Sequence, residues 1–138
     1  MNEEGRILAL DYGEKNIGFA LSDPCRIFAK PLFVIANEGF DKLVTKLQEM
    51  IAKHQISLLI VGIPYAIDGS VTPKTEECQQ LLNNLKAILT IPVEGFDERY
   101  STWEANTELK KMGYNWQQAK SHIDAMAAAM FLKEYLAK

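Results

Sequence analysis

The sequence is poor in the residues that build disulfide-linked or zinc-linked folds. Its 138 residues include two cysteines and two histidines, and Cys25 and Cys78 belong to no CxxC or Cys/His cluster. We therefore expect neither a structural zinc site nor a disulfide framework, which fits a reducing cytosol. No apolar run approaches the roughly 20 residues that cross a bilayer, and the acidic start, Met1–Glu4, is unlike a signal peptide. We expect a cytoplasmic protein with no membrane partner.

The sequence also lacks an excess of positive charge. The 18 acidic residues outnumber the 15 basic ones, so the net charge is −3. This balance counts against a non-specific nucleic-acid binder, but not against an enzyme that contacts phosphates locally. There is no linker, repeat or low-complexity tract, and 48% of the residues are hydrophobic. We therefore expect residues 1–138 to form one domain with its own core.

The hydrophobic pattern predicts an α/β fold. Short apolar runs predict strands at Arg6–Asp11, Ile17–Ser22, Pro31–Ile35, Ser57–Ile63 and Ile91–Phe96. Helical spacing and capping residues predict helices over Phe40–His54, from Thr72-Pro73 to about Leu89, from Ser101 to near Gly113, and from Trp116 or Ser121 to Leu136. Because three strands with short connections precede the αβ units, we expect a five-stranded mixed sheet flanked by helices. Its N-terminal strands should be antiparallel, the later ones parallel, and the first strand central.

Acidic residues interrupt this apolar pattern at three places. Asp11 ends the first predicted strand, where an acid is a poor strand residue and carries a desolvation cost. Asp97-Glu98-Arg99 ends the fifth strand, and Asp124 is the only polar residue between Ile123 and Leu132. If acids from these places converge, a divalent cation must neutralise them, and oxygen ligands favour Mg²⁺ or Mn²⁺. A metal pair held by carboxylates is a standard device for phosphodiester hydrolysis.

Each acid also has a purely structural interpretation. Asp11 could accept backbone hydrogen bonds in a turn, and Asp124 could close a capping box that begins at Ser121 if the last helix starts late. Asp97 or Glu98 could pair with Arg99 at the surface. Because neighbours along a strand point to opposite faces, only one of Asp97 and Glu98 should be a primary ligand.

Three cations lie close in sequence to the proposed acids. Lys15, Arg99 and Lys120 are therefore candidate phosphate contacts, although scattered cations are usually solvated.

Four segments together resemble the YqgF/RuvX family. They are DYGEKNIGFALSD (11–23), VGIPYAIDGS (61–70), DERYST (97–102) and HIDAMAAAMFLKEYL (122–136), and the resemblance spans nearly the whole chain. It implies an RNase H-like fold and a metal-dependent, Holliday-junction-resolvase-like hydrolase that processes the 5′ end of pre-16S rRNA. It assigns Asp11, Glu98 and Asp124 as catalytic and metal-binding residues, with Mg²⁺ or Mn²⁺ as the cofactor. Its implied partners are pre-rRNA, branched DNA and ribosomal precursor particles. The chain departs from the family at Asn16, where an arginine is usual.

Two other functions stay open on the sequence. Actin-like ATPases and sugar kinases share the strand-hairpin-strand start, but they need two such domains around a cleft. A non-catalytic nucleic-acid-binding module could have kept the same fold, because fold alone does not fix function. No feature of the sequence indicates an oligomeric state.

Overall fold

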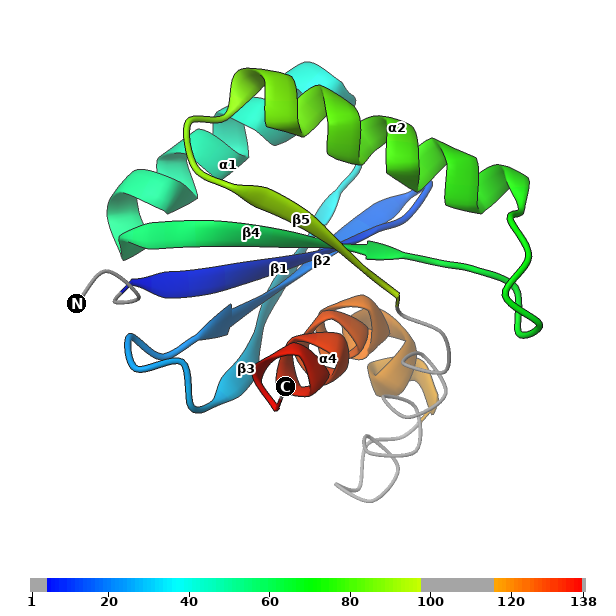
Figure 1. Cartoon of the computed structure of the whole chain (residues 1–138). Helices are drawn as coiled ribbons and strands as arrows, with labels where there is room; N and C mark the ends of the chain where they lie inside the picture. Colours follow the sequence, from blue (N-terminus) through cyan, green and yellow to red (C-terminus); the bar gives the residue numbers. More distant parts are fainter. Residues whose placement is uncertain (1–4, 98–115, 138) are drawn as a thin grey trace.

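The computed structural model describes residues 5–97 and 116–137, with only the backbone of helix residues 116–124 (Figure 1). The predicted helix from Ser101 to near Gly113 lies outside the described residues. The elements are β1 (Arg6–Tyr12), β2 (Asn16–Ser22), β3 (Ala29–Ala36), α1 (Phe40–His54), β4 (Ile56–Ile63), α2 (Pro73–Ile88), β5 (Val93–Asp97) and α4 (Trp116–Leu136). No helix in the described part of the chain is long and apolar enough to span a membrane.

The five strands form one mixed sheet in the order β3-β2-β1-β4-β5. β1 pairs antiparallel with β2, and β2 pairs antiparallel with β3. β4 pairs parallel with both β1 and β5. The mixed sheet and the central first strand are therefore as predicted. Because β1, β4 and β5 run the same way, their carboxyl ends meet at one edge, which we call the carboxyl edge.

Helices cover both faces of the sheet (Figure 1). On one face, Leu8 and Leu10 of β1 pack in a buried cluster that includes apolar residues of α1 and α2. On the other face, Ile7 and Ala9 pack in a second cluster with Ala128 and other residues of α4. The strand is apolar on both sides, which is the pattern expected of a central strand buried between two layers. Successive residues of β1 therefore alternate between the α1/α2 face and the α4 face.

Two strand boundaries differ from the prediction because of proline. β3 begins at Ala29 and runs through Pro31, which a strand at the edge of a sheet tolerates since one side of its backbone has no strand partner. β5 begins at Val93 rather than Ile91. Pro92 has no N–H to donate, but its carbonyl still accepts a hydrogen bond from the Leu59 backbone N–H at 3.1 Å.

The first turn of α2 is fixed as the sequence predicts. Thr72 is the N-cap, Pro73 follows it, and Thr72 and Thr75 form a reciprocal capping box. The Thr75 side chain is fully buried, and its hydroxyl also donates to the carbonyl of Pro64, the first residue after β4. The start of α2 is thereby attached to the carboxyl edge.

Candidate active site at the carboxyl edge of the sheet

Asp11 lies at the carboxyl edge, on the face of the sheet that α4 covers. It is the second-to-last residue of β1 and is half-buried. Since Ile7 and Ala9 face α4, the alternation of the strand directs Asp11 to the same side. It is paired in register with Gly18 of β2, within the ladder rather than in the turn. An acid at this position lies where open α/β sheets commonly bind ligands.

Glycines lie on both sides of Asp11 in the sheet. Gly18 lies opposite it on β2, and Gly62 of β4 follows Val61, the partner of Leu10. Neither neighbouring strand therefore contributes a side chain next to the Asp11 carboxylate in this row.

The turn between β1 and β2 brings Lys15 to the same edge. A side chain at Gly13 would collide with the Asn16 carbonyl oxygen, so this turn requires glycine. Asn37 braces the turn, because its side-chain amide donates to the Gly13 carbonyl at 2.9 Å and its backbone N–H donates to the Lys15 carbonyl at 2.8 Å. The exposed Lys15 is thus carried by a fixed turn close to Asp11 in the chain.

Asp97 reaches the same edge on the opposite face of the sheet. A Cβ built at Gly95 would lie 3.1 Å from the Leu82 side chain of α2, whereas Phe96 packs with α4 residues. Alternation then places the exposed Asp97 on the α2 face with Gly95. Asp97 and Asp11 therefore do not face one another.

α4 is held against β5 by aromatic packing. The Phe131 ring stacks on Phe96 with their centroids 5.9 Å apart, and the Tyr135 ring meets Phe96 edge-on at 6.1 Å. The Tyr135 hydroxyl donates to Glu94 at 3.0 Å. Burial, followed by this hydrogen bond, raises the pKa of Tyr135 above its ordinary value of 10.0, which keeps the hydroxyl protonated as a donor.

The contacts along β5 give the direction of α4. Phe131 contacts Phe96, while Tyr135, one turn later, reaches back to Glu94. The helix therefore runs against β5, and its earlier turns lie toward the carboxyl edge. Asp124 belongs to those earlier turns, one helical turn before the buried Ala128.

Of the two predicted starts of the last helix, Trp116 is confirmed and Ser121 is wrong. α4 begins at Trp116, so Asp124 lies in the helix interior and cannot be the fourth residue of a capping box that starts at Ser121. The small residues after it, Ala127 and Ala128, are buried against the sheet as expected for a close approach.

Several predicted site residues lie outside what the structure describes. Glu98 and Arg99 are outside the described residues, and so are the side chains of Lys120 and Asp124. Within the described ranges, no group of three His, Cys, Asp or Glu side chains is placed to hold a metal ion. The meeting of Asp11, Glu98 and Asp124 stays a prediction.

One cation at the carboxyl edge was missed by sequence reasoning. The Lys74 Nζ lies 5.1 Å from the centroid of the Tyr12 ring, next in the chain to Asp11, and 3.3 Å from the Glu77 carboxylate. The sequence did hold a signal for this lysine. Lys74 lies in the first turn of α2, and the loop before that helix begins at the end of β4. A helix that follows a parallel strand starts at the carboxyl edge of the sheet.

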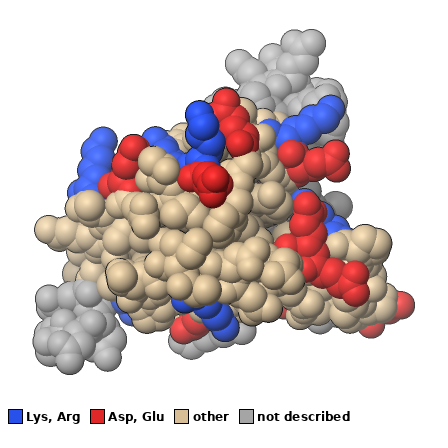
Figure 2. Space-filling view, turned by 90° about the horizontal axis from the view of Figure 1, so that it is seen from above, with Lys and Arg blue, Asp and Glu red and all other residues tan. Residues whose placement is uncertain are grey.

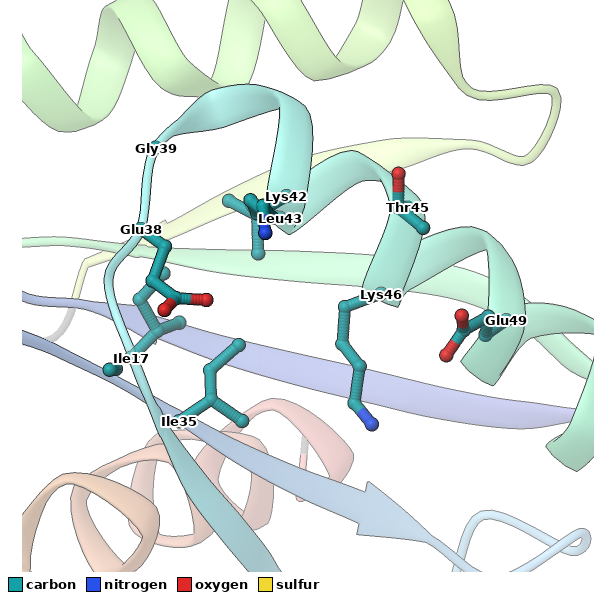
Figure 3. A pocket seen from close by; sticks show the side chains of 10 residues that line it. Ile17, Ile35, Glu38, Gly39, Lys42, Leu43, Thr45, Lys46 and Glu49 are labelled. Atoms are coloured by element: carbon teal, nitrogen blue, oxygen red, sulfur yellow. The ribbon is translucent and has the colours of Figure 1, made fainter.

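On the α1/α2 side of the molecule, the described residues carry charges of both signs. Figure 2 shows positive and negative side chains interspersed around this side. A pocket of about 330 Å³ lies between α1 and the β2–β3 strands (Figure 3). Its lining includes Lys42 and Lys46 but also Glu38 and Glu49, so its charges balance. This balance favours neither an anion nor a cation there.

Comparison with known proteins identifies close relatives in sequence. A family model described as "RuvX: Holliday junction resolvase" matches residues 5–138. A Roseiflexus sp. (strain RS-1) protein named "Putative pre-16S rRNA nuclease" is 33% identical over 135 residues, which cover 98% of this chain and 96% of that protein. A Maridesulfovibrio salexigens protein of the same name is 32% identical over 133 residues, which cover 96% of this chain and 98% of that protein.

Solved structures share the fold at low sequence identity. The fowlpox virus Holliday junction resolvase matches with a TM-score of 0.55 and 12% identity, over 96% of this chain and 98% of that one. T. thermophilus RuvC in complex with a Holliday junction substrate matches with a TM-score of 0.52 and 10% identity, over 94% and 96% of the two chains. The sheet and its helices therefore have the RNase H-like fold of RuvC-like resolvases, as the resemblance in sequence implied.

Proposed function

Because this chain belongs to the RuvX family, described as Holliday junction resolvases, we propose that it is a nuclease that hydrolyses phosphodiester bonds in structured nucleic acid. The names of the relatives favour the precursor of 16S rRNA as the substrate. The family description and the resolvase structures favour branched DNA as the second candidate. The observation that carries the proposal is the half-buried Asp11, on the α4 face of the carboxyl edge between two glycine positions.

We propose Asp11, Glu98 and Asp124 as the ligands of a divalent metal ion. The donor set consists of carboxylate oxygens, which suit Mg²⁺ or Mn²⁺ better than the softer metals. Such an ion, when bound, supplies an activated water and stabilises the departing oxygen. Asp11 would anchor the site from the rigid central strand, and α4 would supply Asp124 from the opposing layer.

The position of Asp97 supports the choice of Glu98 within the Asp97-Glu98 pair. Asp97 lies on the α2 face, away from Asp11 and α4. A shared ligand set with Asp11 must come from the α4 face, which leaves Glu98 as the candidate from this segment.

Lysines at the carboxyl edge are proposed to hold the phosphate backbone. Lys15 lies on the β1–β2 turn that follows Asp11, whereas Lys74, at the start of α2, lies on the opposite face of the same edge, over the Tyr12 ring. Each can neutralise a phosphate locally, which the net charge of −3 does not oppose. Arg99 and Lys120 remain candidates for the same role.

The proposal is tested by cleavage assays with purified protein. A pre-16S rRNA fragment and a four-way DNA junction are each incubated with Mg²⁺, Mn²⁺ or chelator. We expect metal-dependent cleavage, and a loss of at least about 100-fold in Asp11→Asn, Asp124→Asn and Glu98→Gln, since even indirect supports of metal ligands are worth about 10–100-fold. Asp97→Asn should lose less cleavage activity than these three variants.

A matched control separates this loss from a general effect of removing an acid. Asp41 is an exposed aspartate in the first turn of α1, so Asp41→Asn should cleave as the wild type does. Melting temperatures in chelator should stay the same or rise in the three site variants, because a self-repelling acid is removed. Cleavage by Asp11→Asn at the wild-type rate would overturn the proposal. Nucleic-acid binding without any cleavage would instead favour the non-catalytic module.

A further inference from the structure

We propose that a second pocket at the carboxyl edge binds one unpaired nucleobase of the strand that is cut, and that guanine fits it best. This inference rests on the proposed nuclease function. The pocket has a volume of about 440 Å³ and lies between the ends of β4 and β5 and the side of α2. It is lined by Ile63, Tyr65, Gly69, Gln79, Leu82, Gly95, Phe96 and Asp97.

The walls of this base pocket suit a flat aromatic ring. Ile63 and Leu82 supply apolar surface, and Tyr65 supplies an aromatic ring. Gly95 contributes no side chain, and the Leu82 and Ile63 side chains pack directly against it, since a Cβ there would lie 3.1 Å from Leu82 and 3.2 Å from Ile63. Unstacked bases are commonly held against aromatic and apolar side chains in this way.

The polar groups of the base pocket suit a base that carries both N–H donors and an acceptor. Gln79 Nε2 donates to the Tyr65 hydroxyl oxygen at 3.3 Å, which directs the Tyr65 O–H proton to a further acceptor. The Asp97 carboxylate at the end of β5 also lines the pocket, and its two oxygens offer several acceptor positions, so it can accept an N–H group in addition to the interaction that it already makes. Guanine presents two adjacent N–H donors and a carbonyl on its pairing edge, whereas uracil presents a single N–H. An apolar pocket with a few convergent polar groups is the usual form of a specific site.

The location of the base pocket fits a nucleotide near the cleaved bond. β5 is two strands away from β1, so about 10 Å of sheet separates the end of β5 from Asp11. That lateral distance alone corresponds to roughly three nucleotides of a stacked strand, and the step from one face of the edge to the other adds to it. The metal site and the base pocket lie on opposite faces of the same edge, so a strand that crosses the edge can reach both.

The loop between β4 and α2 adds apolar surface beside the pocket. It contributes Tyr65 and Gly69 to the lining and exposes Ile67 and Val71, whose side chains are 75% and 53% accessible.

The first test measures base binding without cleavage. In chelator, 5′-GMP, IMP, AMP, CMP and UMP are titrated into the full chain, and binding is followed by amide NMR shifts, including those of Gly69 and Gly95. We expect GMP to bind most tightly and IMP, which lacks the 2-amino group, to bind about fivefold more weakly for the lost hydrogen bond. Gln79→Ala should weaken GMP binding by a similar factor. Equal binding of GMP and UMP would overturn the inference.

A matched glutamine on the same helix controls for changes in α2. Gln80 is exposed and donates to Asn84 at 3.0 Å, outside the base pocket, so Gln80→Ala should bind GMP as the wild type does. If Gln79→Ala and Gln80→Ala weaken binding equally, the pocket is not the site.

The second test distinguishes a base within the strand from a free nucleotide. A substrate with randomised bases beside the cut is cleaved and the new ends are sequenced. We expect a guanine preference within a few nucleotides of the cut. Gln79→Ala and Asp97→Asn should reduce this preference, and Gln80→Ala should retain it. Cleavage without any base preference would overturn the inference and leave the nuclease proposal intact. GMP binding without any cleavage would overturn the nuclease proposal, and with it the role of the pocket in binding substrate.

Discussion

The attachment of α4 to the sheet can be tested by replacing Phe131 with alanine. Phe131 is fully buried, and its ring stacks on Phe96 with an interplanar angle of 23°. Truncating a buried phenylalanine to alanine costs about 3–5 kcal/mol of unfolding free energy. A chain of 138 residues has an unfolding entropy of about 0.29 kcal/mol/K, so the melting temperature should fall by about 10–17 °C.

Thermal and urea unfolding of the purified variant measure this loss. The same substitution at Phe28, which is 71% exposed, is the control and should change the unfolding free energy by less than about 0.5 kcal/mol. The dependence of the free energy on urea should be unchanged in both variants. A loss below about 1 kcal/mol in Phe131→Ala would refute the packing of α4 described above. It would also remove the structural basis for placing Asp124 near Asp11.

Three further predictions concern stability. Thr75→Val should cost about 2–3 kcal/mol in urea unfolding, because it leaves the Thr72 N–H and the Pro64 carbonyl without their partner; Thr45→Val, at an exposed site, should cost little. Burial, then the charges of Lys53, Arg6 and Lys30, lower the pKa of His54 below its ordinary value of 6.5. The unfolded chain is thus protonated first, and stability should fall as the pH drops below about 6.5, with a smaller slope in His54→Gln. The Phe28 backbone N–H, with those of Ile27 and Cys25, lowers the pKa of Asp23. This stabilisation should be lost as the pH falls below about 3.8, and Asp23→Asn should flatten that part of the acid-unfolding curve.

Most of the sheet could be predicted because its strands are continuously apolar. Leu8–Leu10 and Leu58–Ile63 are buried on both faces, and such runs between turn residues indicate central strands. The strand ends were less predictable, since Pro31 lies inside β3 while Pro92 precedes β5. In both cases the position in the sheet, which is a tertiary property, decides whether the missing N–H matters.

The sequence could predict those parts of the site that depend on local pattern, but not those that depend on tertiary packing. The strand pattern of Ile7, Ala9 and Asp11 was enough to place Asp11 at the end of a central strand, and the apolar surroundings of Asp124 marked it as unusual. The opposite orientation of Asp97 could be recognised only from the structure, in which Gly95 packs against α2 and Phe96 packs against α4. Lys74 was overlooked because its neighbour Tyr12 is distant in sequence and approaches only through the parallel pairing of β1 and β4.

The central claim is that Asp11 and Asp124, which are distant in the chain, hold one divalent ion together. Calorimetric titration of Mn²⁺ into the wild-type chain, Asp11→Asn, Asp124→Asn and the double variant tests it most directly. We expect each single substitution to weaken Mn²⁺ binding at least tenfold, and the double variant to lose less than the sum of the two single losses, because both remove ligands of the same ion. Wild-type affinity in Asp11→Asn would contradict the claim.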